Sequence, residues 1–400
     1  MPETISCLPG RDFRPAAPAT AEAPRDVVFT FSYVSWAGAQ LRGMCFAQDR
    51  LAQTLLDDPR VARLLVCNLP RSRPVKLVKD ALRPGPEFPA SDSARLHEPL
   101  RLRRQDPRSI RALERWYRLY DRRLRRAALR FGMQRPAVIT AHPLIAGFPE
   151  LSWAGPVTFY ATDDWAAYPR GKAWWPAYEE SYARVRKSGR GVCAVSDTIV
   201  QRIRPSGPSI VVPNGIQPAE WVDPGRPPEW FLALPRPRLL YVGTLDSRLD
   251  IAGLRRVAAA YPDGSVVLVG RSYDDPHLAP LSQHANVHVR PAVKRPEVAA
   301  IVSAADACLL PHRRTALTEA MSPLKVYEYL AGGRPVAATD LPPVRNISNR
   351  LVLEPESGDF PGAVKRALAL GPAGEAERMD FVSAHSWQRR HRQILDFALR

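Results

Sequence analysis

Short apolar runs alternate with amphipathic stretches along most of the chain. The runs are rich in Val, Ile, Leu and Phe, which is typical of strands buried on both faces of a parallel sheet. They predict strands over 26–31, 63–67, 137–140, 157–160, 191–195, 209–212, 239–242, 266–269, 287–289, 307–310 and 335–338. Helical spacing predicts helices over 43–56, 108–130, 174–187, 197–204, 251–260, 296–304 and 322–331. A loop is expected over 32–41, and the segment over 70–99 is expected to include a long loop.

Proline interrupts this alternation near the middle of the chain. Residues 213–238 hold seven prolines, which marks a linker. The pattern therefore predicts an α/β protein with two doubly wound, Rossmann-like domains, over 1–212 and 239–384, facing each other across a cleft. A final helix over 385–400 is expected to pack back toward the first domain. Ligands of such sheets bind at the carboxyl ends of the strands, so the cleft is the expected site.

The composition narrows the class of protein. With 45% hydrophobic and 24% charged residues, the chain is not of the disordered kind. No apolar run approaches the roughly 20 residues that span a bilayer, and residues 1–23 lack the apolar core of a signal peptide. The five cysteines are widely spaced without a C-x-x-C pair, which predicts neither disulfides nor a zinc site. We therefore expect a cytoplasmic protein.

The charge is strongly positive and uneven. Lys and Arg number 57 against 40 Asp and Glu, a net charge of +17, and residues 101–130 hold twelve arginines against three acidic residues. Leucines and aromatics interleave with these arginines, which predicts a basic amphipathic helix over 108–130. Its charged face is either simply solvated or attaches the protein peripherally to the anionic inner face of the cell membrane. Nucleic acid is the less favoured partner, because no zinc-finger, RRM or KH pattern is present.

The segment over 322–331 holds the most specific candidate binding groups in the sequence. Ser322 is expected to cap this helix, Pro323 suits its first position, and Gly332 or Gly333 would end it. Its amino end should face the cleft, where free N–H groups and the helix dipole favour a phosphate. Lys325 and Glu328 would share one face, the lysine near a diphosphate and the carboxylate near ribose hydroxyls. The alternative is a surface helix with an ion pair.

At this point the chain resembles a known family. The segment LKVYEYLAGGRPVAATDLPPVR looks like the nucleotide-binding helix and strand of GT-B glycosyltransferases, and is most similar to the large group 1, or family 4, type. Further similar segments follow in the expected order: AVS at 194–196, VVPNGI at 211–216, YVGT at 241–244 and VVLVG at 266–270. The resemblance extends from about Val138 to Trp387. It implies transfer of a sugar from a UDP- or GDP-sugar to a hydroxyl of a cell-envelope, polysaccharide or lipid-linked acceptor.

The same resemblance implies the residues of the site. Nucleotide-sugar contacts would come from Gly243, Thr244, Arg248, Arg271, Val293 (through its backbone), Ser322, Leu324, Lys325 and Glu328. His142 follows a strand and would line the donor sugar, unless it is structural. Asp163 would act as a base toward the acceptor or cap the next helix. Gly38 would let the backbone approach the donor or acceptor.

Two departures from the family pattern stand out. The family often has two Glu separated by seven residues, but Ala320 occupies the first position and Glu319 lies one place away. Only Glu328 is therefore kept, and the stereochemical outcome stays open. The usual Arg and Lys phosphate pair is incomplete, with Arg248 and Lys325 as the candidates. No cofactor and no metal are implied, since no Asp-x-Asp motif follows a strand.

Two other functions are compatible with these patterns. A nucleotide-sugar epimerase also uses two such domains, and it would isomerise the donor without transferring the sugar. A basic nucleic-acid-binding protein would be driven by the +17 charge and would show steep salt dependence.

Overall fold

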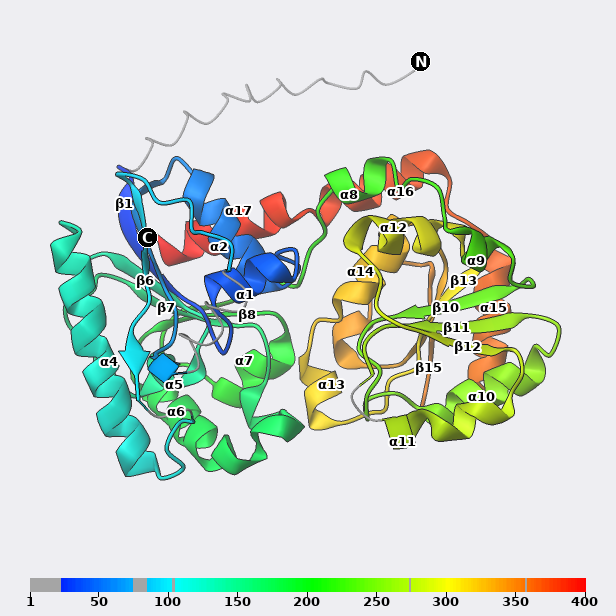
Figure 1. Cartoon of the computed structure of the whole chain (residues 1–400), viewed down its shortest axis with the longest axis horizontal. Coiled ribbons are helices and arrows are strands. Elements are labelled where there is room, and N and C mark those ends of the chain that lie inside the picture. The colour runs from blue at the N-terminus through cyan, green and yellow to red at the C-terminus, as the bar shows by residue number, and fades with distance from the viewer. Residues whose placement is uncertain (1–22, 75–84, 103–104, 273–274, 357) are drawn as a thin grey trace, which may run out of the picture.

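The computed structural model describes residues 23–74, 85–102, 105–272, 275–356 and 358–400. Two α/β domains lie side by side, with the N-terminal one at the left of Figure 1 and the C-terminal one at the right. Every strand pairing in the two large sheets is parallel. This architecture confirms the predicted pair of doubly wound domains.

The N-terminal domain is built on a seven-stranded sheet. Its strands, in spatial order, are β4 (Ala94–His97), β2 (Val61–Cys67), β1 (Arg25–Thr30), β6 (Ala137–Thr140), β7 (Val157–Ala161), β8 (Gly191–Ala194) and β9 (Ser209–Val211). Its helices are α1 (Trp36–Leu41), α2 (Ala47–Asp57), α4 (Ile110–Arg130), α5 (Pro143–Gly147), α6 (Trp175–Lys187) and α7 (Asp197–Ile203), with 3-10 turns η1 (Trp165–Ala167) and η2 (Pro169–Trp174). β3 (Arg71–Ser72) and β5 (Leu100–Arg101) form a small separate pair. The central strand β6 is buried at every residue, because helices cover both faces of the sheet.

The C-terminal domain has a six-stranded sheet. Its strands, in spatial order, are β12 (Val287–Arg290), β11 (Ser265–Val269), β10 (Arg238–Val242), β13 (Ala307–Leu310), β14 (Val336–Thr339) and β15 (Leu351–Glu354). Its helices are α10 (Ile251–Ala260), α11 (Asp275–Leu278), α12 (Arg295–Ala304), α13 (Ala316–Ala320), α14 (Leu324–Ala331), α15 (Phe360–Leu370) and α16 (Glu375–Ala384), with turns η3 (Ala279–Gln283) and η4 (Pro342–Val344). Separate apolar cores fill the two faces of this sheet.

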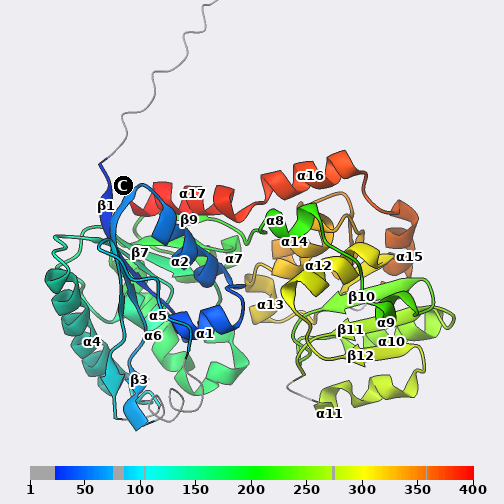
Figure 2. The ribbon, with the colours of Figure 1, turned by 45° about the horizontal axis from the view of Figure 1, so that its top comes forward.

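The chain crosses between the domains twice. The proline-rich segment carries two short helices, α8 (Ala219–Val222) and α9 (Glu229–Leu232), and the last helix, α17 (Trp387–Ala398), returns to the N-terminal domain (Figure 2). The two crossings bond to each other, because Ile216 N–H donates to His385 C=O at 3.0 Å and Trp387 N–H donates to Ile216 C=O at 2.8 Å. α17 packs on α2 and β8. The two crossings thus form one paired connection beside the cleft.

Some local predictions were wrong. The segment 32–41, expected to be a loop, contains α1, which Ser35 caps by accepting the Gly38 N–H at 3.2 Å. The segment over 70–99, expected to include a long loop, also contains β3 and the edge strand β4, and its part over 75–84 lies outside the described residues. The helix expected from residue 43 begins at Ala47, after left-handed residues at Gly43 and Met44. β15, α15 and α16 were not predicted at all.

Candidate functional site

A glycine allows a lysine to reach the carboxyl end of β10. Gly243 follows the strand with φ of +151°, and a Cβ there would lie 2.3 Å from Lys325 Cε and 2.9 Å from Nζ. No other residue type fits without displacing the lysine. Lys325 Nζ lies 5.3 Å from the centre of the Tyr241 ring. α14 and β10 therefore bring together two segments that are 82 residues apart in the chain.

Arg248 is the second cation at this strand end. Asp246 holds it with two hydrogen bonds, from Arg248 Nε and Nη2, each of 2.9 Å. Burial alone would raise the pKa of Asp246, but the bonds and charge of Arg248 outweigh it and lower this pKa. The guanidinium is consequently fixed in orientation by a carboxylate that stays ionised.

The pKa of Lys325 is lowered to about 7. Burial is the largest cause and the charge of Arg248 is the next, while Glu328 and Asp246 act in the opposite direction. The surroundings of Lys325 therefore disfavour its charged form more than the two carboxylates favour it. An anion placed beside Lys325 and Arg248 would favour the protonated lysine.

A buried histidine lies behind these cations. His312 follows β13 and is fully buried, with Nε2 3.4 Å from Tyr241 Oη. Within the described part of the chain its Nδ1 has no hydrogen-bond partner. Burial, followed by the charges of Lys325 and Arg248, lowers its pKa well below the usual value, so the ring is neutral.

Glu328 takes part in a chain of ion pairs that reaches the other domain. Its Oε1 accepts from Arg295 Nη1, and Arg295 Nη2 donates to Glu220, which also pairs with Arg50 of α2. Burial disfavours the charge of Arg295, but the carboxylates of Glu328 and Glu220 outweigh it and raise this pKa. Glu328 is only 7% exposed, and among the described residues Arg295 binds its Oε1.

Asp163 faces these groups from the N-terminal domain. It follows β7 and is half-buried, and burial raises its pKa to about 6. Arg248 is the largest influence in the opposite direction, so the two side chains lie close enough to interact across the cleft. The neighbouring Asp164 instead caps η1, accepting from Ala166 N–H at 3.2 Å, and pairs with Arg202. The capping alternative thus describes Asp164, and Asp163 is the carboxylate at the cleft.

His142 does not line the cleft in this structure. It is fully buried and caps α5, where its Nδ1 accepts the Leu144 N–H at 3.2 Å. Its Nε2 lies 3.3 Å from Tyr117 Oη, and burial lowers the pKa of the ring to about 3. The Tyr33 ring lies 4.6 Å from it. Both nitrogens are engaged inside the domain, which favours the structural alternative, and the role of His142 beside the donor sugar stays a prediction.

The expected cap of α14 was also wrong. Pro323 occupies the N-cap position and offers no side-chain hydrogen bond, whereas Ser322 turns to the linker. There Ser322 Oγ accepts from Asn214 N–H at 3.1 Å, and the Asn214 side chain donates to Ser322 C=O at 2.6 Å. Leu324 packs against the core of the N-terminal domain. The amino end of α14 therefore meets the facing domain, and Gly333, with φ of +71°, follows its last turn as expected.

Four candidates remain: Gly38, Thr244, Arg271 and Val293. Gly38 sits in the first turn of α1, where its N–H is bound by Ser35, so it offers no free donor. The Thr244 C=O accepts from Tyr241 Oη at 3.0 Å. Arg271 is exposed just after β11, and its C=O accepts from Leu245 N–H at 3.0 Å. Val293 is half-buried in the loop between β12 and α12.

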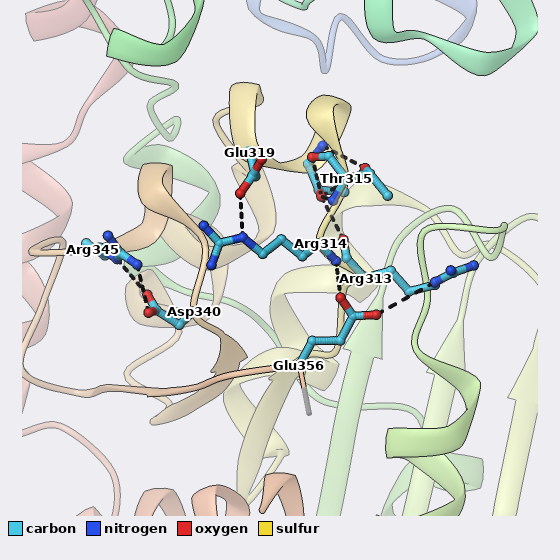
Figure 3. Close-up of polar contacts among 8 residues, drawn as sticks. Arg313, Arg314, Thr315, Glu319, Asp340, Arg345 and Glu356 are labelled. Carbon is cyan, nitrogen blue, oxygen red and sulfur yellow. Dashed lines mark hydrogen bonds and ion pairs between the residues drawn. The ribbon is translucent and has the colours of Figure 1, made fainter. Parts of the chain in front are cut away.

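Figure 3 shows where the displaced glutamate of the family pattern lies. Glu319, on α13, points to Arg314 and forms an ion pair with it. The Arg314 N–H donates to Glu356 at 2.6 Å, and Thr315 caps α13. Ala320, which holds the first position of the pattern, is buried, and its C=O accepts from Ser196 Oγ of α7. Glu319 is thus committed to its own domain, and a contact between domains occupies the neighbouring position.

Sequence reasoning missed several of these residues. Tyr241, His312, Arg295 and Glu220 were not selected, although Tyr241 lies within a quoted segment and His312 directly follows a predicted strand. Its position just after a predicted strand is the signal that could have identified His312. Arg295 and Glu220 carried no such signal, because they meet Glu328 only through tertiary packing.

Neither a metal-ligand cluster nor a membrane-spanning helix is present among the described residues. No group of three or more His, Cys, Asp or Glu side chains there could hold a metal ion. None of the helices in the same ranges has the length and apolar character needed to cross a membrane.

Comparisons with known proteins agree that this chain is similar to glycosyltransferases. Residues 236–369 match the family model described as "Glycosyl transferases group 1". A curated relative, "Putative teichuronic acid biosynthesis glycosyltransferase TuaH" of Bacillus subtilis (strain 168), is 26% identical over 165 residues, covering 39% of this chain. That match spans 42% of the relative's length, less than half of it.

Solved structures extend the likeness to both domains. A sucrose-phosphate synthase from Thermosynechococcus elongatus has a TM-score of 0.64 at 16% identity, covering 92% of this chain and 97% of that one. An alpha,alpha-trehalose-phosphate synthase (UDP-forming) from Burkholderia vietnamiensis has a TM-score of 0.68 at 12% identity, covering 93% and 96%. At these identities the likeness concerns the fold. Together with the family match, it confirms the resemblance to GT-B glycosyltransferases of the group 1 type.

Proposed function

We propose that this protein transfers a sugar from a UDP- or GDP-sugar to a hydroxyl group of a cell-envelope, polysaccharide or lipid-linked acceptor, without a metal ion. The observation that carries the proposal is the meeting of Lys325 and Arg248 beside Gly243 at the carboxyl end of β10. Two fixed cations at the mouth of a parallel sheet suit a diphosphate.

The transfer breaks the bond between the anomeric carbon and the β-phosphate oxygen and forms a bond from the acceptor oxygen to that carbon. The breaking bond leaves its electron pair on the diphosphate, so negative charge grows there. Arg248, oriented by Asp246, and Lys325 would stabilise this charge. Since both side chains are positioned in the folded protein, little reorganisation is needed as the charge develops.

The donor nucleoside would be held by Glu328. Its Oε1 is engaged by Arg295, and its Oε2 would accept hydrogen bonds from ribose hydroxyls. Arg295 would keep the carboxylate ionised and fixed in place. UDP is the first donor nucleotide to test, because the Burkholderia vietnamiensis structure is of a UDP-forming synthase.

Asp163 would accept the proton of the acceptor hydroxyl. With a pKa of about 6, this carboxyl is mostly ionised at neutral pH and is still a better base than an exposed aspartate. The name of the curated relative points to a cell-envelope polymer as the acceptor. The basic helix α4 would bring the enzyme to the anionic inner face of the membrane, as a peripheral cytoplasmic protein.

The first experiment is nucleotide binding by the purified full-length chain. Thermal unfolding with UDP, GDP, ADP and dTDP should show a higher Tm with UDP or GDP, since a ligand of the folded form stabilises it. Glu328→Ala should lower the affinity for that nucleotide about tenfold or more, which corresponds to the loss of a hydrogen bond to a charged group. Glu319→Ala is the matched control, because Glu319 pairs with Arg314 away from Lys325. Equal affinity in the wild type and Glu328→Ala would refute the assignment.

The second experiment identifies the reaction. Incubation with the preferred UDP- or GDP-sugar and an acceptor extract should release the nucleoside diphosphate and label the acceptor. Recovery of an isomerised nucleotide sugar without release would instead indicate an epimerase. Transfer should persist in excess EDTA, and loss of transfer that added Mg²⁺ restores would contradict the metal-independent proposal.

A further inference from the structure

A hollow with strongly positive walls lies between β4 and the second half of α4. We name it the arginine pocket, lined chiefly by Arg95, His97, Arg123, Arg126, Arg130 and Phe131. Its volume is about 340 Å³, and none of its lining residues is acidic. It lies on the outer flank of the N-terminal domain, where α4 forms the edge of the molecule away from the C-terminal domain (Figures 1 and 2). The arginine pocket is therefore separate from the cleft.

The carboxylates of α4 do not neutralise this pocket. Glu114 pairs with Arg118 and with Arg184 of α6, and Asp121 accepts from the Trp153 indole N–H at 2.7 Å. Both acids are thus occupied on other faces of the helix. In the described residues Arg95, Arg126 and Arg130 form no ion pair, although Arg95 stacks on the Phe131 ring at 4.5 Å. Among the described residues, no carboxylate pairs with Arg95, Arg126 or Arg130 of the pocket.

The floor of the pocket is preorganised. Arg123 donates to the Leu100 C=O at 3.0 Å, which anchors its guanidinium at β5. His97 Nε2 is buried and has no hydrogen-bond partner in the described part of the chain. Burial, and then the charges of Arg123 and Arg130, lower the pKa of His97, so these arginines act directly on the ring. Several arginine side chains consequently line one space that has no carboxylate among its lining residues.

We propose that the arginine pocket binds a phosphate group, either of a soluble phosphorylated molecule or of an anionic lipid headgroup. Guanidinium groups match phosphate oxygens in pairs, which favours phosphate over a lone carboxylate. The volume is suited to one phosphate with part of its carrier. Leu129, 57% exposed on the same stretch of α4, would contact the apolar part of a lipid. The inference does not depend on the proposed function, because the pocket shares no residue with the cleft.

The test compares two variants of equal charge on one helix. Arg126→Gln/Arg130→Gln removes two charges from the pocket, whereas Arg122→Gln/Arg125→Gln removes two exposed charges of α4 outside its lining. The first probe is inorganic pyrophosphate, whose binding is measured by calorimetry with UDP present to saturate the cleft. The second is phosphatidylglycerol vesicles, whose binding is compared with that of phosphatidylcholine vesicles by flotation. The pocket variant should bind at least one phosphate probe tenfold or more weakly, and the control variant should change less than threefold.

The outcomes separate the possible sources. Pyrophosphate binding that is lost in the pocket variant indicates a soluble ligand, and vesicle binding that is lost indicates a lipid headgroup; either supports the inference. Equal losses in both variants would show that only general charge attraction operates, and would overturn it. So would the absence of binding to both probes, or binding to an RNA oligomer alone. UDP affinity should stay at the wild-type value in both variants, so failure here is distinguishable from failure of the cleft assignment.

Discussion

On the C-terminal side of the cleft, charged side chains are presented already paired, as with Arg248 on Asp246 and Glu328 on Arg295. On the N-terminal side, the strand ends carry mainly buried and capping groups, such as His142 and Asp164, with Asp163 as the exception. The family match likewise covers 236–369, within the C-terminal half. Under the proposed function, the donor would meet charges that are already paired, whereas the acceptor would meet Asp163 among buried and capping groups.

The largest effect is expected from removing the fixed guanidinium. Arg248→Gln should lower kcat/KM by about 100-fold or more, because it deletes a donor that acts on the leaving group. Arg256→Gln, at an exposed arginine 3.9 Å from Asp250, is the matched control and should act like the wild type. Steady-state transfer kinetics measure both variants. A near-normal Arg248→Gln enzyme would contradict the view that the C-terminal side supplies the charge stabilisation.

The next effect should come from Asp163, the base that we propose on the N-terminal side. Asp163→Asn should lower kcat by roughly 10- to 100-fold while nucleotide affinity is kept, as for the loss of a general base. In the wild type, kcat/KM should fall as the pH drops below about 6, because the carboxyl becomes protonated. This limb should be absent in Asp163→Asn. Asp164→Ala should instead lower Tm, since it removes a cap and an ion pair.

A smaller effect concerns the pH dependence of donor binding. Lys325 has a pKa of about 7 in the free protein, and a bound diphosphate would raise it. Binding then takes up a proton, and affinity should fall by up to about tenfold for each pH unit above 7, until the bound-state pKa is reached. Calorimetry in buffers of different ionisation enthalpy measures this uptake. Lys325→Met should bind weakly and without proton uptake, whereas unchanged uptake in that variant would refute the role of the lysine.

The smallest effect on catalysis is expected at His142. His142→Phe should leave kcat nearly unchanged but lower the free energy of unfolding by about 1–2 kcal/mol, because α5 loses its cap and Tyr117 loses a partner. Denaturant unfolding and transfer kinetics on the same sample measure both quantities. A large fall in kcat at wild-type stability would restore a catalytic role for His142 and blur the contrast between the two sides.

The strands were the most predictable part of the fold. β6 and β13 match the expected ranges residue for residue, because a strand buried on both faces needs a continuous apolar run. The edge strand β4 was missed, since three of its four residues contact solvent and the apolar run in ARLH is not continuous. α1 was missed because it is only six residues long and lies between two predicted elements.

The candidate site was predicted only where one segment holds its chemistry. Lys325 and Glu328 lie three residues apart on one helix, so helical spacing alone puts them on one face. The capping role of Ser322 was wrong, and the contact of His142 with Tyr117 was not predicted, because Asn214 and Tyr117 are distant from them in sequence. No local pattern distinguishes a serine that caps its own helix from one that binds a linker.

Hydrophobic periodicity and the proline-rich linker by themselves determined two parallel α/β domains and the helix that carries Lys325 and Glu328. Such local patterns report how each segment buries its own apolar surface. The partners of those side chains were decided only by tertiary structure: Gly243 beneath Lys325, Arg295 and Glu220 beside Glu328, and Asp163 opposite Arg248. Electrostatic pairing depends on distances between segments far apart in the chain, and only packing sets those distances.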